Sequence, residues 1–317
     1  MSCLPGEWEA AERVGGYFLA PRLLRAEYTA LPGLPSEAEL DATALRADVD
    51  FEIELAWLLR LGAGGEYVRR GSSRRFHRVY PTSGNLQSVV SHVVDPARRL
   101  GGRSASHLRG VRVLHYDPVR HALGPLATIA ARGSIALNGV FLALTSVPAR
   151  QAVKYGPRGQ RYAWLDLGHA LAALVQAAQV LGWRCALVPS RRRELQTLLD
   201  LDSSPDFAEL ETEVAGVLLY VQDSPFDLDE VQGLWQALTA QRCSRSSVRA
   251  PSLPLADARL AALLRDAYWA LPAETLSARG LQCASLAEPR AHRLQPAPAR
   301  ALLQRRTPDH FEGGCLL

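Results

Sequence analysis

The 317-residue sequence has few cysteines, a single methionine and no metal-binding cysteine pair. Its five cysteines are odd in number, widely spaced and form no Cys-x-x-Cys motif. This pattern argues against both a disulfide framework and a structural zinc site. Free thiols fit a reducing compartment, so we expect a cytoplasmic protein without a bound metal.

Long apolar runs and a strong charge bias are also missing. No uninterrupted apolar run reaches the length of a membrane span, and the acidic N-terminus lacks the apolar core of a secretory signal. Lys and Arg number 36 against 32 Asp and Glu, and the arginines are scattered rather than interleaved with aromatic residues. We therefore expect no membrane and no nucleic acid among the partners.

The residues that are present predict a globular α+β protein. Hydrophobic residues make up 48% of the chain, which is enough for a substantial core. Helices and short strands follow one another without regular βαβ alternation, which favours a layered α+β fold with a central sheet of about four or five strands. The expected helices cover 51–62, 165–181, 191–201, 227–238 and 256–271, and the expected strands lie within 88–94, 111–117, 139–147, 181–190 and 214–222.

Two of these segments carry specific expectations about burial. The run 139–147 is continuously apolar, which suits a central strand buried on both faces, and the helix at 165–181 is apolar nearly all round, which suits burial against the sheet or another subunit. The arginine-rich stretch 66–78 is expected to be a solvated loop. Composition divides the chain into an N-terminal arm (1–48), a main unit (49–245), a helical or linker extension (246–298) and a tail (299–317).

Two short stretches invite a functional interpretation. The first is PTSGNLQ at 81–87, whose residues favour a turn. Its hydroxyls, amides and backbone N–H groups could also line a planar polar ligand. The second begins with Lys154 and Tyr155 in a glycine-containing turn, directly ahead of the long helix. Taken alone, the lysine could be solvated and the tyrosine packed.

Asp166 and His169 lie three residues apart, on one face of that helix. A metal site or a catalytic dyad would need such a pair. We interpret them instead as a helix-entry cap and a buried, hydrogen-bonded histidine, because both roles are common for these residue types.

The two stretches, together with GVRVLHYDPVRHALGPL at 110–126 and the run KYGPRGQRYAWLDLGH at 154–169, resemble the SagB-type branch of the nitroreductase superfamily. The resemblance covers roughly residues 50–222. It implies a nitroreductase-like α+β fold, with a mostly antiparallel central sheet flanked by helices. It also implies FMN as the cofactor and a dehydrogenase that oxidises peptide thiazolines and oxazolines.

The resemblance assigns roles to individual residues. Lys154 and Tyr155 match a pair implied to act in catalysis, where a base must take the proton that leaves as a hydride passes to the flavin. A departure follows Gln87, where Ser88, Val89 and Val90 replace the glutamate and proline of the family pattern. The implied contacts to the flavin ring are Pro81, Thr82, Ser83, Asn85 and Gln87.

An arginine clamp for the flavin phosphate is missing ahead of Phe51. The tail supplies a matching run, Arg305, Arg306 and Thr307, so it resembles the start of a second, truncated nitroreductase-like unit. Planar guanidinium groups suit a phosphate because they form paired, charge-assisted hydrogen bonds. The resemblance therefore implies a homodimer or a tandem pseudo-dimer, with the helix at 165–181 at the interface.

Two functions remain open from the sequence. The first is an FMN-dependent oxidoreductase of the SagB or nitroreductase type, acting on an azoline or another small-molecule or peptide substrate. The alternative is a catalytically degenerate protein that keeps the nitroreductase fold as a binding or scaffolding unit. The pair Lys154 and Tyr155 favours the first, and the missing clamp favours the second.

Overall fold

The computed structural model describes residues 23–24, 28–35, 49–70, 73–96, 110–130, 138–199, 201, 213–241, 243–245 and 248–249. The helix expected at 256–271 and the tail from residue 299 lie outside these ranges. The described helices are α3 (Phe51–Gly62), α4 (Pro148–Tyr155), α5 (Gly159–Val180), α6 (Arg192–Leu198) and α7 (Leu228–Thr239), with the short 3-10 helices η1 (Ser83–Asn85) and η3 (Gly156–Arg158).

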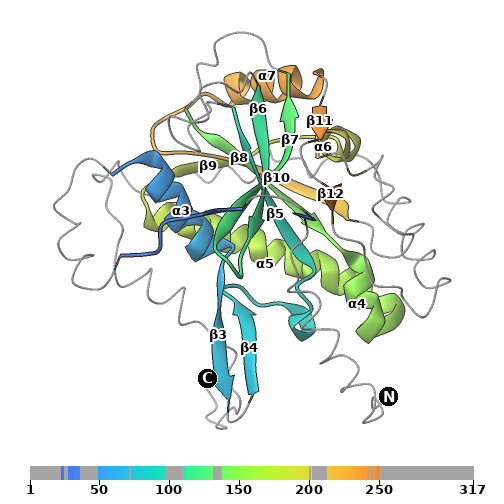
Figure 1. The fold of residues 1–317 in the computed structure, drawn as a ribbon. Helices are drawn as coiled ribbons and strands as arrows, with labels where there is room; N and C mark the ends of the chain where they lie inside the picture. The colour runs from blue at the N-terminus through green and yellow to red at the C-terminus, as the bar shows by residue number, and fades with distance from the viewer. Residues whose placement is uncertain are drawn as a thin grey trace, which may run out of the picture.

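A single large antiparallel sheet forms the centre of the molecule (Figure 1). Its strand order is β11-β7-β6-β5-β8-β10-β9, with β2 also paired to β7, and every pairing in it is antiparallel. The strands are β2 (Thr29–Ala30), β5 (Val89–Asp95), β6 (Val111–Asp117), β7 (Ala122–Ile129), β8 (Val140–Ser146), β9 (Arg184–Leu187), β10 (Val214–Gln222) and β11 (Cys243–Arg245).

Helices cover both faces of this sheet, which confirms the predicted α+β class. Leu142 and Leu144 of β8 pack in one core with α3 and α5, and the alternate residues Phe141 and Ala143 pack in a second core with α6 and α7. Figure 1 shows α5 below the sheet and α7 above it. Because side chains alternate along a strand, burial on both faces requires a continuous apolar run. The prediction for 139–147 is therefore confirmed.

The strand count was wrong, since the described residues alone form a central sheet of eight strands rather than four or five. One missed strand is β7, where Gly124 and Pro125 suggest a break. Pro125 is tolerated because it lies at a shift in the register with β6, opposite Leu114. The edge strands β2 and β11 are too short to give a sequence pattern.

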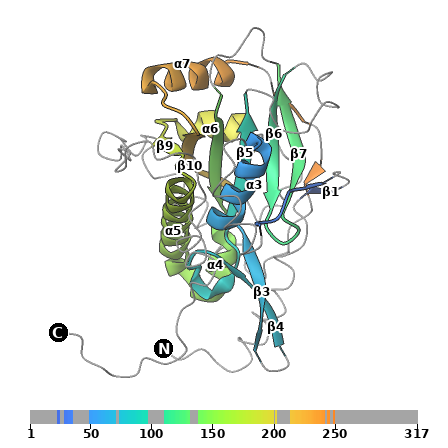
Figure 2. The same cartoon turned by 90° about the vertical axis from the view of Figure 1, so that its left-hand side faces the viewer.

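The arginine-rich stretch expected to be a solvated loop is instead a two-stranded antiparallel sheet. It pairs β3 (Gly65–Arg70) with β4 (Ser73–Arg78), and Figures 1 and 2 show it projecting away from the central sheet. Arg69, Arg74 and Arg75 are exposed, so their charges are compatible with strand positions. Tyr67, Val68 and Phe76 favour the extended backbone. A further pair joins β1 (Leu23–Leu24) to β12 (Val248–Arg249).

The long helix begins earlier than the sequence suggested, at Gly159 rather than near Leu165. One face, including Leu167, Leu174 and Ala178, is buried against α3 and the sheet, which confirms the expected burial. The opposite face is open in the described structure, and Leu165 there is 51% exposed. The helix at 227–238 also matches, because the Asp227 carboxylate accepts hydrogen bonds from the first turn of α7.

Two glycines on these helices test the packing of α3 against α5. A Cβ on Gly62 would lie 2.7 Å from Leu174 Cδ2 and 2.8 Å from Leu174 Cα, whereas a Cβ on Gly168 would meet no atom within 4 Å. We expect Gly62→Ala to lower the free energy of unfolding by about 1–3 kcal/mol through overpacking. We expect Gly168→Ala to raise it by about 0.4–1 kcal/mol, because alanine favours the helix. Urea unfolding of both variants measures this, and equal stability would contradict the close contact.

Candidate functional site

The turn that contains PTSGNLQ joins β4 to β5 and includes η1. Its backbone is unusual: Gly84, Asn85 and Gln87 have φ angles of 64°, 56° and 55°. Non-glycine residues seldom adopt positive φ, and such conformations persist only where surrounding contacts hold them. The contacts around this turn therefore decide its shape.

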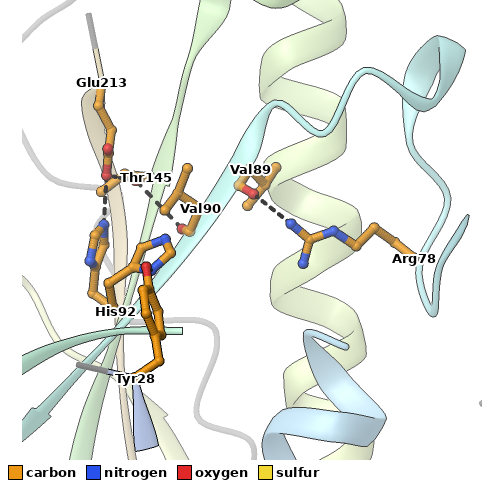
Figure 3. Close-up of polar contacts among 8 residues, drawn as sticks. Tyr28, Arg78, Val89, Val90, His92, Thr145 and Glu213 are labelled. Carbon is orange, nitrogen blue, oxygen red and sulfur yellow. Dashed lines mark hydrogen bonds and ion pairs between the residues drawn. The ribbon is translucent and has the colours of Figure 1, made fainter. Parts of the chain in front are cut away.

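Two buried arginines hold the end of the turn. Arg78 Nε donates to Gln87 Oε1 at 2.5 Å, and its other nitrogens donate to the carbonyl oxygens of Ala63 and Val89 at 2.6 and 3.3 Å. Figure 3 shows the Arg78 guanidinium directed at the carbonyl of Val89. Arg150, from α4, donates to the backbone oxygen of Gln87 at 2.6 Å. Both guanidinium groups thus fix Gln87 from inside the protein.

The amides of the turn are also bound within the protein. Asn85 Nδ2 donates to the carbonyl oxygen of Phe76 at 2.7 Å, and Asn85 Oδ1 accepts from Gln87 Nε2 at 2.9 Å. Gln87 itself is buried. The family resemblance assigned both side chains to a flavin ring. In the structure their hydrogen bonds stabilise the turn itself.

Asp166 fastens the turn to the helices. Its carboxylate accepts from the backbone N–H and the hydroxyl of Ser83, both at 2.8 Å, from the hydroxyl of Ser88 at 3.0 Å and from Gln151 Nε2 at 2.6 Å. Burial raises the pKa of Asp166 above its ordinary value, and the hydrogen bonds from Ser83 and Ser88 oppose that shift. The carboxylate therefore connects the turn, α4 and α5.

The expected roles of Asp166 and His169 need correction. Asp166 lies in the body of α5, after its start at Gly159, so it does not cap the helix entrance. His169 is exposed rather than buried. The first error arises because the helix begins earlier than its apolar pattern, and residues 159–164 are also helical. The second arises because His169 lies on the open face of α5, beside the exposed Gly168.

Lys154 and Tyr155 lie beside the turn. They end α4 rather than lying in a turn, and both are half-buried. A Cβ on Gly84 would lie 2.8 Å from Tyr155 Oη and 3.0 Å from Lys154 Nζ. Lys154 Nζ is 5.5 Å from the centroid of the Tyr155 ring, and this ring packs against the ring of Tyr162, with 4.4 Å between the two centroids. Only glycine fits at position 84 without moving these groups.

The remaining assigned residues divide into two groups. Pro81 is exposed and Thr82 is half-buried, so both border the turn on its open side. Arg305, Arg306 and Thr307 lie outside the described residues. The hydroxyl of Tyr80, directly before the turn, is buried without a hydrogen-bond partner among the described residues, and burial raises the pKa of Tyr80.

A second polar cluster, which the sequence did not reveal, lies on the sheet face toward α6 and α7. His92 Nε2 contacts Glu213 Oε1 at 2.6 Å, and Thr145 donates to the same oxygen at 2.6 Å (Figure 3). His115 is paired with His92 across β5 and β6, and its Nδ1 lies 3.1 Å from the hydroxyl of Tyr28. The sequence signal that could have indicated this cluster is one histidine in each of two predicted strands, His92 and His115.

This second cluster does not form a metal site. His92, Glu213, His115 and Thr145 are all buried. In the part of the chain that the structure describes, no group of three or more His, Cys, Asp or Glu side chains is placed to hold a metal ion.

No described helix is both long and apolar enough to cross a membrane.

Comparison with known proteins gives distant likenesses only. No protein-family profile and no curated protein matches the chain. A structure described as a nitroreductase from Anabaena variabilis is 17% identical with a TM-score of 0.45, and the match covers 86% of this chain but 55% of that one. This chain thus spans about half the length of that relative.

Two further structures are similarly distant. The Escherichia coli microcin synthetase McbBCD complex, with truncated pro-MccB17 bound, matches at 19% identity and a TM-score of 0.42, over 71% of this chain and 84% of that one. A structure described as a nitroreductase from Ralstonia eutropha matches at 15% identity and a TM-score of 0.42, and the match covers 66% of this chain and 96% of that one. Values this low do not establish a family, so any functional conclusion depends on the geometry of the site and the sequence motifs.

The raised pKa of Asp166 predicts a pH dependence of stability. Between the ordinary value of 3.8 and the higher folded value, the folded chain binds more protons than the unfolded chain. The free energy of unfolding, taken relative to Asp166→Asn, should therefore fall as the pH rises above 3.8 and level off once the folded carboxyl is ionised. Urea unfolding of both proteins across this range measures the difference, and a difference that grows with pH would mean a lowered pKa.

Proposed function

We propose that this protein is a flavin-dependent oxidoreductase of the nitroreductase type, and that it belongs to the SagB branch, which oxidises azoline rings. One observation carries the proposal. The two stretches that resemble this family, far apart in the sequence, meet in space where Gly84 lies against Lys154 and Tyr155.

We place one edge of the flavin ring at Gly84. This glycine is exposed, and because a Cβ there would lie 2.8 Å from Tyr155 Oη and 3.0 Å from Lys154 Nζ, its lack of a side chain lets the turn approach both residues closely. The ring of FMN carries carbonyl oxygens and nitrogens that need hydrogen-bond donors, and the hydroxyl of Thr82, which borders the turn on its open side, can donate. Bound at this place, FMN would supply the acceptor for a hydride.

The chain's own residues would then handle the substrate proton. Lys154 and Tyr155 are half-buried at the end of α4, where they can take a proton from a substrate or hold one in place. Their position is fixed, because α4 is tied through Gln151 to Ser83 and Asp166. We assign Lys154 as the general base and Tyr155 as a donor that orients the substrate.

The phosphate of FMN is assigned to the tail. Arg305, Arg306 and Thr307 would hold it, and the tail would belong to a second unit of a tandem pseudo-dimer or to a homodimer. This assignment rests on the resemblance of these three residues to the clamp of the family, since they lie outside the described residues.

A specific observation favours a second candidate function. Ser83, Asn85 and Gln87 all bind other groups of the protein, so fewer ligand donors remain at the turn than the family pattern implies. This favours a binding or scaffolding unit that keeps the fold without the chemistry. Binding of FMN separates the two functions.

Titration with FMN tests the cofactor and the tail together. We expect the full chain to quench flavin fluorescence on binding, and a chain truncated before Ala299 to bind more weakly by about one to several kcal/mol, the scale of charged hydrogen bonds. Gly233→Ala, at an exposed position on α7 where an added Cβ would meet no atom within 4 Å, serves as the control. Equal affinities would remove the tail from the site, and no binding by the full chain would leave the scaffolding function.

Substitution of the proposed catalytic pair tests the chemistry. Lys154→Ala and Tyr155→Phe should each lower turnover of a peptide thiazoline by roughly 10²–10⁴-fold, the usual contribution of a general acid or base. Flavin content should stay near normal. Mass spectrometry follows the loss of two hydrogen atoms from the peptide. Normal turnover by Lys154→Ala would place this lysine outside the chemistry.

A further inference from the structure

The hairpin of β3 and β4 stands apart from the rest of the molecule (Figures 1 and 2). It is a two-stranded sheet with no third strand among the described residues, so each strand has one open edge. Isolated two-stranded hairpins are only marginally stable in water. A projecting hairpin with open edges is therefore a candidate for pairing with another chain.

The hairpin concentrates positive charge. Residues 65–78 contain five arginines and one glutamate, a difference of four, which equals the net charge of the whole chain. Arg69 lies directly opposite Arg74 in the strand register, and both are exposed. Neither contacts a carboxylate among the described residues. Like charges placed directly opposite each other destabilise a strand pair, so this arrangement is unfavourable without an anionic partner.

An aromatic surface lies beside these arginines. Tyr67 is opposite Phe76 and two residues from Arg69, so all of them share one face of the hairpin with Arg74. The Tyr67 ring is 41% exposed, and the Arg74 guanidinium lies 4.3 Å from its centroid. Stacking on the ring restricts the orientation of this guanidinium. Arg74 is thereby prepared to bind a carboxylate through paired hydrogen bonds.

The base of the hairpin is attached to the candidate site. Phe76 accepts the hydrogen bond from Asn85 through its backbone oxygen, and Arg78 binds Gln87. A chain bound along the hairpin would therefore run toward the turn that carries Gly84. The hairpin and the site can act on the same molecule.

We propose that the hairpin binds an acidic peptide segment in extended conformation, with carboxylates on Arg69 and Arg74 and backbone pairing along an open edge. Resting on the proposed function, this assigns the substrate as an azoline-containing peptide with an acidic flanking segment. A peptide fits better than a nucleic acid, because Arg74 already covers part of the Tyr67 ring on which a base would stack.

Binding can be measured without flavin or turnover. We would follow the fluorescence anisotropy of a labelled peptide of alternating Glu and Thr, with an alternating Gln and Thr peptide as the neutral comparison. The wild-type chain should bind the acidic peptide and not the neutral one, and added salt should weaken binding because it screens the charges. Arg69→Glu should weaken binding roughly ten-fold to a hundred-fold, on the scale of a lost charge-assisted hydrogen bond.

Matched variants separate local binding from total charge. Arg193→Glu makes the same charge change at an exposed position on α6 and should alter the affinity less than about two-fold, because it lies on a helix away from the hairpin. Arg69→Lys should keep most of the affinity, and thermal unfolding should show that each variant folds. An equal loss in Arg193→Glu, no loss in Arg69→Glu, or tighter binding of a single-stranded oligonucleotide than of the peptide would overturn the proposal.

The outcome is independent of the flavin experiments. If the acidic peptide binds and FMN does not, the proposed oxidoreductase activity is wrong and the hairpin remains a docking surface. If FMN binds and the acidic peptide does not, the activity stands and the assignment of an acidic peptide substrate is wrong.

Discussion

The arrangement of the candidate site depends on the buried carboxylate of Asp166. A buried charge is unfavourable unless hydrogen bonds compensate it, and here the turn and α4 supply four. The resulting contacts hold Ser83 and Gln151 together and bring α4 against the turn. The same contacts occupy the Ser83 hydroxyl, which the sequence assigned to a ligand. Rigidity of the turn and ligand binding thus compete for one set of polar atoms.

Much of the fold could be predicted because its signals are local. The continuous apolar runs of β8 and β10 reflect burial on both faces, and α3 and α7 have clear helical spacing. The prediction failed where tertiary context overrides local preference. Pro125 lies in a strand because it falls at a register shift, and Arg69, Arg74 and Arg75 lie in strands at exposed positions. Neither exception is visible in a short window of sequence.

The family resemblance assigned the stretch 81–87 and the pair Lys154 and Tyr155 to one flavin site, and that assignment stays a prediction. In the structure Gly84 of the first stretch lies against Lys154 and Tyr155, but the hydrogen bonds around them could not be predicted. Which polar atoms remain for a ligand depends on partners distant in the chain. Ser83 and Asp166 are 83 residues apart, and His92 and Glu213 are 121 residues apart. No spacing rule links such positions, because the register of the sheet and the docking of α5 determine them.

The connectivity of the central sheet has a consequence for how the chain acquires its structure. The pairing of β6 with β7 is a local hairpin, but Leu142 of β8 pairs with Leu219 of β10, and Val93 of β5 pairs with Leu142. Each distant pairing must close a long loop before its contacts form, and chains dominated by such pairings reach the native state slowly. During synthesis β5, β6 and β7 leave the ribosome before β8 and β10. An apolar strand edge on β5 therefore stays unpaired until β8 has been synthesised, and unpaired apolar strand edges of this kind are prone to aggregate.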